Sequence, residues 1–183
     1  MGVLLYFLVI PHRVDKERQL VILSIVFIAT YLIPLLVLLF LKSFTLITSF
    51  QVESIQERKI PIIFMIILFY LLGNFFYRYN IISDLGLLFY ATALSLGAVY
   101  CLFFLKIKTS LHLLSIGSTL GFFLILGIYH TISLTLVYSL LILIAGFLAS
   151  ARLYLKAHRP YEIYIGFFLG ILCQFLVFYF YRI

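Results

Sequence analysis

The sequence predicts an all-α fold: a polytopic membrane protein built as a bundle of six transmembrane helices. The first observation behind this prediction is composition, since 66% of the 183 residues are hydrophobic and 10% are charged. A soluble domain has about 25% charged residues because its surface faces water. The composition therefore excludes a soluble globular enzyme, a disordered protein and a disulfide-stapled secreted domain.

The second observation is a set of six apolar segments, each near the length of about 20 residues that a bilayer-spanning helix needs. Polar and apolar residues do not alternate within them, as they do in the strands of a membrane β-barrel. No internal repeat and no long linker divides the chain, so residues 1–183 are expected to form one domain. The expected spans are about residues 20–41, 60–77, 85–105, 110–129, 131–149 and 161–181.

Two prolines mark the N-terminal part of the chain. The apolar stretch from Val3 to Ile10 is too short to span a bilayer and ends at Pro11, so it is expected to lie in or near the interface. Pro34 falls inside the first span. A proline there removes a backbone donor and clashes with the preceding turn, so a kink is expected at this point.

The links between the spans hold most of the polar side chains. The first link, residues 43–59, is the longest, and the last, residues 150–160, is the richest in groups capable of chemistry. Pro160 ends the last link and suits the first turn of a helix, where its missing N–H needs no partner. The links between these two are short, and they are residues 77–84, 106–108 and 129–131.

The charge balance is basic, with 13 Lys and Arg against six Asp and Glu. Basic residues flank membrane spans and favour anionic headgroups, so the excess needs no nucleic-acid partner. With six spans, five Lys and Arg lie on the face of the N-terminus and eight on the other face. The positive-inside rule would place the face with eight in the cytoplasm. If Lys108, Arg152 and Arg159 are retained for function, each face has five other Lys and Arg, so the count does not determine which face lies in the cytoplasm.

Two pairs of glycines lie four residues apart, Gly117 with Gly121 in the fourth span and Gly166 with Gly170 in the sixth. Small residues at this spacing let membrane helices approach closely, and these glycines are expected to bring His112 and His158 together. The alternative is that glycine is simply common in membrane helices. The cysteines, Cys101 and Cys173, lie in apolar runs and are expected to be small apolar residues rather than a disulfide.

One histidine and one acid stand out among the few ionisable groups. His158 precedes the sixth span and Glu162 opens it, one helical turn apart, so the carboxylate can accept a hydrogen bond from the imidazole. His112 opens the fourth span on the same face of the membrane. The alternative is a basic turn whose side chains reach headgroups, with Arg159 facing them. His12 and His130 are expected to be interfacial residues without a role.

A family resemblance follows from these residues. Arg152-x5-His158-x3-Glu162 resembles the third signature of the type 2 phosphatidic acid phosphatase superfamily, Ser-Arg-x5-His-x3-Asp. Ser110-Leu111-His112 resembles the second signature, Pro-Ser-Gly-His, with the serine and histidine kept. The resemblance covers about residues 106–175. Glu162 replaces the usual aspartate, and the first signature, Lys-x6-Arg-Pro, is not found as written.

The resemblance implies a metal-independent phosphatase, without a cofactor, that hydrolyses a membrane lipid phosphate or diphosphate through a phosphohistidine. In this family the residue that matches His158 is the nucleophile, the acid that matches Glu162 orients it, and the residue that matches His112 is the general acid. The resemblance also implies a bacterial inner (cytoplasmic) membrane with the site facing the periplasm. The residues expected to bind phosphate are Arg152, Lys108 and Ser110.

The sequence also allows two other functions. A catalytically degenerate relative would bind phospholipid headgroups as a structural or regulatory membrane protein. A transporter or channel would show charges at mid-span, inverted repeats or broken helix pairs, and Pro34 is the one feature of that kind. The sequence names neither the lipid nor the oligomeric state.

Overall fold

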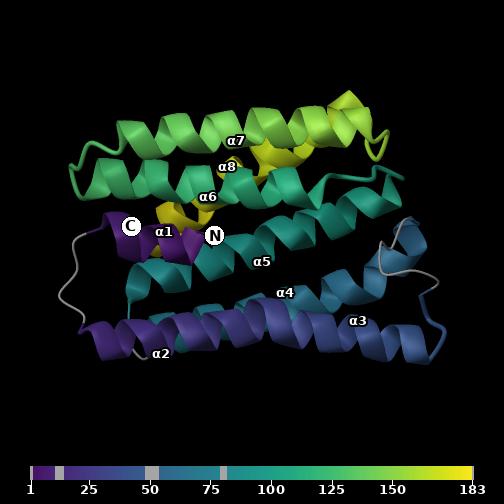
Figure 1. Cartoon of the computed structure of the whole chain (residues 1–183), viewed down its shortest axis with the longest axis horizontal. Helices are drawn as coiled ribbons and strands as arrows, with labels where there is room; N and C mark the ends of the chain where they lie inside the picture. Colours follow the sequence, from purple (N-terminus) through teal and green to yellow (C-terminus); the bar gives the residue numbers. More distant parts are fainter. Residues whose placement is uncertain (1, 11–14, 48–53, 79–81, 183) are drawn as a thin grey trace. The chain divides into compact units, whose positions relative to one another are not determined.

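A computed structural model describes residues 2–10, 15–47, 54–78 and 82–182. Pro11, the expected end of the N-terminal apolar stretch, and His12 lie outside the described residues. The described part of the chain is made of helices joined by loops and contains no strand, which confirms the all-α prediction (Figure 1). In chain order the helices are α1 (Gly2–Val9), α2 (Lys16–Phe27), η1 (Ile28–Leu32), α3 (Ile33–Ser43), α4 (Ile55–Arg78), α5 (Ser83–Phe104), α6 (Leu111–Tyr129), α7 (Thr135–Tyr154) and α8 (Pro160–Arg182).

Six stretches of helix among the described residues are long and apolar enough to cross a membrane, as expected. The first is the continuous run α2–η1–α3, and the others are α4, α5, α6, α7 and α8. The fifth span differs most from its predicted bounds of 131–149, because α7 starts at Thr135 and continues to Tyr154. Arg152 therefore lies in the last helical turn and not in the loop.

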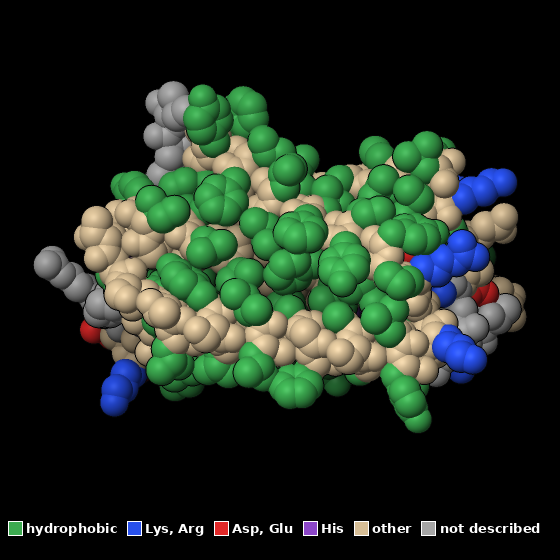
Figure 2. All heavy atoms as spheres, turned by 90° about the horizontal axis from the view of Figure 1, so that it is seen from above, with side chains coloured by type: hydrophobic (Ala, Val, Ile, Leu, Met, Phe, Trp, Pro, Cys, Tyr) green, Lys and Arg blue, Asp and Glu red, His purple; other side chains and the backbone are tan. Residues whose placement is uncertain are grey.

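Large apolar side chains on the spanning helices face outward. On α7, Leu136 is 74% exposed and Phe147 is 70% exposed. Figure 2 shows hydrophobic side chains over most of the visible face, with basic side chains near its edges. Spanning helices that expose so many large apolar side chains are not typical of a soluble monomer, so lipid is the solvent of these helices. The chain is an integral membrane protein.

The chain divides into two compact units, Met1–Met65 and Ile66–Ile183, and the boundary falls within α4. The single-domain expectation for the whole chain stays a prediction. In the first unit, Pro34 is the second residue of α3, which follows the π-helical segment η1. A widened, π-helical turn precedes Pro34, and the kink expected there stays a prediction.

Ser54 starts α4 with a cap that the sequence analysis did not identify. Its hydroxyl accepts a hydrogen bond from the backbone N–H of Glu57 at 3.2 Å. Serine followed three residues later by glutamate is a helix-start signature, because such caps satisfy exposed N–H groups. Residues 55–59, expected to be part of the first link, are therefore helical.

In the second unit, α8 packs most extensively on α6, and α7 and α5 pack beside this pair. The glycines allow the approach. A Cβ on Gly117 would overlap the carbonyl of Phe167, and one on Gly170 would lie 2.6 Å from the backbone N of Ser118. The close approach of helices that this glycine spacing predicts is present, whereas the meeting of His112 with His158 stays a prediction. Apolar side chains fill the space among α6, α7 and α8, and they include Leu113, Ile116, Ala145 and Ile163.

In the described part of the chain, four helices end in the same backbone motif. In each, a non-glycine residue adopts a left-handed conformation, and the next N–H bonds back to a carbonyl five residues earlier. At the end of α7 this residue is Lys156, with φ 51°, and Ala157 N donates to Arg152 O at 3.1 Å. The motif turns the chain sharply and delivers residues 157–160 to the start of α8. The left-handed residues are Thr45, Lys106, Thr131 and Lys156.

Candidate functional site

The candidate site forms within the second unit, where the segment before α6 meets the segment before α8. The backbone N–H of Ser110 donates to the carbonyl of Glu162 at 3.2 Å, which joins the two segments directly. His158 and Glu162 come from one segment and Lys108 from the other. Two links separated by a helical hairpin therefore build one site.

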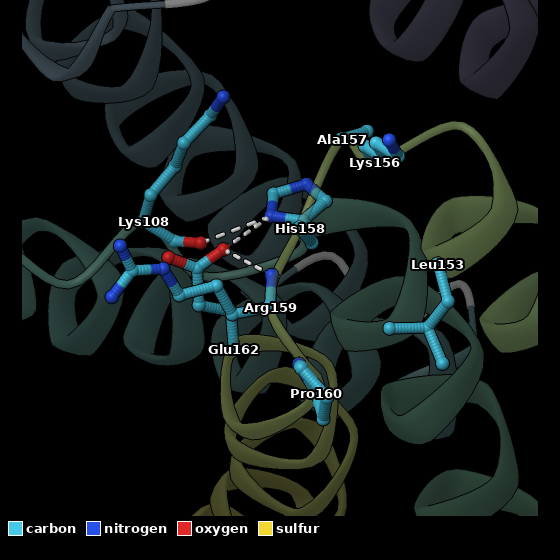
Figure 3. A pocket seen from close by; sticks show the side chains of 8 residues that line it. All are labelled: Lys108, Leu153, Lys156, Ala157, His158, Arg159, Pro160 and Glu162. Atoms are coloured by element: carbon cyan, nitrogen blue, oxygen red, sulfur yellow. Dashed lines mark hydrogen bonds and ion pairs between the residues drawn. The ribbon is translucent and has the colours of Figure 1, made fainter.

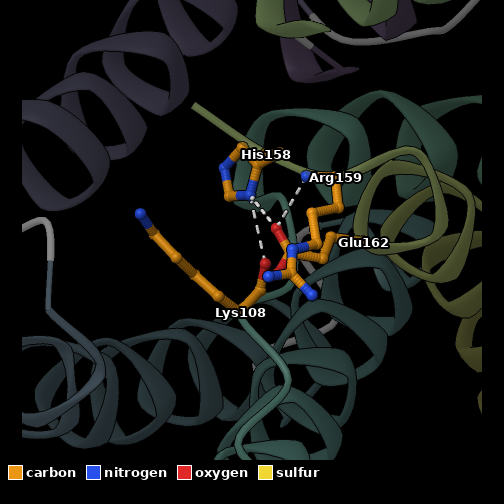
Figure 4. Close-up of polar contacts among 4 residues, drawn as sticks. All are labelled: Lys108, His158, Arg159 and Glu162. Atoms are coloured by element: carbon orange, nitrogen blue, oxygen red, sulfur yellow. Dashed lines mark hydrogen bonds and ion pairs between the residues drawn. The ribbon is translucent and has the colours of Figure 1, made fainter. Parts of the chain in front are cut away.

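The imidazole of His158 is held by two acceptors. Its Nδ1 lies 3.0 Å from Glu162 Oε2 and 3.1 Å from the carbonyl oxygen of Lys108 (Figure 4). Because both neighbours accept, Nδ1 carries a proton, and the lone pair of the neutral ring is on Nε2. In Figure 3 the second ring nitrogen points away from Glu162. The hydrogen bond expected between His158 and Glu162 is present.

Glu162 is fixed by the start of its own helix. Its Oε2 also accepts the backbone N–H of Arg159 at 3.1 Å, the residue just before Pro160 opens α8. A glutamate at the third helical position that reaches back in this way forms half of a capping box. The carboxylate is therefore preorganised, and the side chains of His158 and Glu162 are only 5% and 9% exposed.

A pocket of about 460 Å³ lies over this pair (Figure 3). Three basic side chains line it, against the single carboxylate of Glu162, so its lining is positive. Leu153, Ala157 and Pro160 add an apolar part. The described residues that line the pocket are Lys108, Leu153, Lys156, Ala157, His158, Arg159, Pro160 and Glu162.

The predicted site residues fall into two groups. His158, Glu162 and Lys108 line the pocket, whereas Arg152, Ser110 and His112 are not among its described lining residues. Ser110 is fully buried before α6, and His112 is exposed in the first turn of that helix. Three of the six predicted residues thus line the pocket, and Ser110 joins Glu162 through its backbone.

Sequence reasoning treated two of the pocket cations only as members of a basic turn. Lys156 and Arg159 line the pocket on either side of His158 in the chain. Their closeness to His158 in sequence was the available signal, but the sequence did not show which way the turn folds. Arg159, expected to face headgroups, is exposed and lines the pocket as well.

The site offers a nucleophile or base beside groups that bind an anion. A neutral imidazole with a protonated, carboxylate-bound Nδ1 can attack or accept a proton through Nε2. The chain matches no protein-family model, no curated protein and no solved structure. Among the described residues, no three His, Cys, Asp or Glu side chains are grouped so as to hold a metal ion.

A second histidine–acid pair lies in the same unit, where α5 begins and α6 ends. His130 Nε2 lies 3.3 Å from Asp84 Oδ2, and their side chains are 34% and 9% exposed. This pair joins residues 46 positions apart, which is why the sequence analysis missed it. It lines no part of the pocket, so it provides a matched control for experiments on His158.

Proposed function

We propose that this protein is an integral membrane phosphatase that hydrolyses a lipid phosphate or diphosphate through a phosphohistidine at His158. The observation that carries the proposal is the pair of hydrogen bonds that His158 Nδ1 makes to Glu162 and to the Lys108 carbonyl, beside a pocket lined by basic side chains. The resemblance of this segment to the third signature of type 2 phosphatidic acid phosphatases supports the same roles for His158 and Glu162.

The first chemical step forms the phosphoenzyme. The Nε2 lone pair of His158 attacks phosphorus, a P–N bond forms, and the P–O bond to the alcohol breaks. Glu162 stabilises the positive charge that develops on the ring, in the way that a carboxylate supports histidine in hydrolases. The departing alkoxide takes a proton from a general acid, and the resemblance assigns that role to His112.

The second step releases phosphate. Water attacks the phosphorus and gives a proton to the group that acted as general acid in the first step, which is thereby restored. The P–N bond breaks, and its electron pair returns to Nε2. Charge on the phosphoryl oxygens needs fixed donors in both steps. Lys108, Lys156 and Arg159 are proposed for this from the pocket lining. Arg152 and Ser110 are proposed from the resemblance.

A lipid substrate fits the position of the pocket. Leu153 lies in the last turn of the membrane-spanning helix α7, and Pro160 opens the spanning helix α8. A phosphate held by the basic side chains would leave its apolar chain beside these helices. The inner membrane of a bacterium, with the site on the periplasmic face, is proposed from the resemblance.

A headgroup-binding protein without turnover is the second candidate. One observation favours it: His112, the proposed general acid, is exposed and is not among the described residues that line the pocket. A basic pocket without a proton donor for the leaving alcohol can still bind a phosphate. Both candidates predict binding, and only the first predicts release of inorganic phosphate.

The deciding experiment measures phosphate release by the purified protein in nanodiscs, on a panel of lipid phosphates and diphosphates. We expect turnover and an acid-labile phosphoenzyme in wild type, and neither in His158→Ala. His130→Ala removes the other histidine of an acid pair and should keep wild-type rates per folded molecule. Equal rates in wild type and His158→Ala would refute the enzyme, and no release with retained phosphate-lipid binding would favour the second candidate.

A further inference from the structure

The segment of residues 108–110 binds His158 through a backbone oxygen, so the position of the segment affects the orientation of the imidazole ring. The Lys108 carbonyl accepts from His158 Nδ1 at 3.1 Å. Two residues later, Ser110 N–H donates to the Glu162 carbonyl at 3.2 Å. The segment therefore contacts both the ring of His158 and the first turn of α8.

The hydroxyl groups of this segment do not anchor it. Thr109 and Ser110 are both fully buried, and neither Oγ1 of Thr109 nor Oγ of Ser110 has a hydrogen-bond partner among the described residues. Buried hydroxyls are normally bonded, because an unmade bond costs free energy. Packing and backbone bonds therefore set the position of the segment.

Gly166 provides the space into which the segment packs. It lies one helical turn after Glu162 in α8. A Cβ built on Gly166 would lie 2.6 Å from Ser110 O and 3.2 Å from Thr109 Cγ2, whereas ordinary contact begins at 3.4 Å. Because Ser110 O belongs to the backbone, no side-chain rotation relieves the overlap, and the segment or the helix must move by several tenths of an ångström.

We infer that Gly166 is a positioning residue for His158, acting through segment 108–110 and the Lys108 carbonyl. A shift of that size stretches the bond between Lys108 O and His158 Nδ1 toward about 3.6 Å, where it no longer counts as a hydrogen bond. The ring then loses one of the two hydrogen bonds at Nδ1, and the direction of Nε2 is less firmly fixed. The consequence for turnover rests on the proposed function, but the consequence for the ring does not.

The test follows the ring nitrogens of His158 by ¹⁵N NMR of histidine-labelled protein, with the signals assigned by their loss in His158→Ala. We expect Gly166→Ala to shift the Nδ1 signal and to speed exchange of its proton, and to lower kcat by about tenfold with a smaller change in KM. Gly121→Ala is the packing control. Its Cβ would press on Ile171 of the same helix pair at 3.0 Å, away from segment 108–110, so the His158 signals should stay as in wild type.

Unchanged His158 signals in Gly166→Ala would overturn the inference, and so would equal changes in Gly166→Ala and Gly121→Ala. If Gly166→Ala does not fold, Thr109→Gly decides by the same criteria, because it loosens the segment without adding an atom. If no variant and no wild-type sample releases phosphate, the proposed function fails while the NMR comparison still tests the role of Gly166.

Discussion

Replacing Lys156 by glycine should separate the charge of this lysine from its backbone role. Lys156 has φ 51°, a left-handed conformation that costs an L-residue roughly 1–2 kcal/mol and costs glycine little. Glycine loses about 0.5–1 kcal/mol more backbone entropy on folding. The difference is about 0–1.5 kcal/mol in favour of glycine, so Lys156→Gly should fold and be as stable as wild type or slightly more stable.

The effect on the reaction should come from the lost ammonium. Lys156 lines the pocket but is exposed, so its attraction to a phosphate lies near the value for water, about 1–2 kcal/mol at contact distance. This corresponds to a fall in kcat/KM of about 5- to 30-fold. The assay is initial-rate phosphate release in nanodiscs, repeated at several salt concentrations, and the loss should shrink as salt screens the lysine.

Lys106→Gly is the matched control. Lys106 has the same conformation, with φ 59°, in the link after α5, and it is not among the described lining residues of the pocket. Its replacement by glycine removes the same charge and relieves the same left-handed backbone strain, and kcat/KM should change less than about twofold. Equal losses in the two variants would mean that general surface charge attracts the substrate, and an unchanged Lys156→Gly would remove this lysine from phosphate binding.

Three further predictions test other parts of the site. Arg152→Lys should lower activity strongly although the charge is kept, because an ammonium cannot bind two oxygens as a guanidinium does, and wild-type rates would remove Arg152 from the reaction. Glu162→Gln should lower kcat by about 10²- to 10⁴-fold, with Glu162→Asp partly active, whereas a purely structural Glu162 would change thermal stability and leave turnover per folded molecule intact. Single cysteines at Lys106 and Lys156 should react with a membrane-impermeant thiol reagent from the same side in intact cells, and labelling from opposite sides would contradict the six-span topology.

The spans could be predicted because the bilayer imposes a length and a composition on each helix separately. The contact between His158 and Glu162 was predictable for a similar reason, since one helical turn fixes it locally. The close packing of α6 on α8 was predictable from the glycine spacing. In each case the signal lies within a short stretch of sequence.

Features that depend on the path of a link were not predictable. The end of α7 is set by the left-handed Lys156, and a lysine gives no sign of that conformation. The same turn brings Lys156 and Arg159 to the pocket lining and leaves Arg152 in the helix. The pair of His130 and Asp84 depends on two helix ends meeting, which no local pattern encodes.

The glycine-lined contact between α6 and α8 has a consequence for biogenesis. These helices are separated in the chain by α7, so α6 leaves the ribosome and enters the bilayer well before its main partner exists. Until α8 arrives, lipid must cover the face of Gly117, and Ser118 beside it has a buried hydroxyl with no partner among the described residues. Helices insert first and associate afterwards. The pocket therefore forms only after α8 has inserted. A chain that ends before α8 lacks Glu162, so nothing in it orients the histidine as Glu162 does.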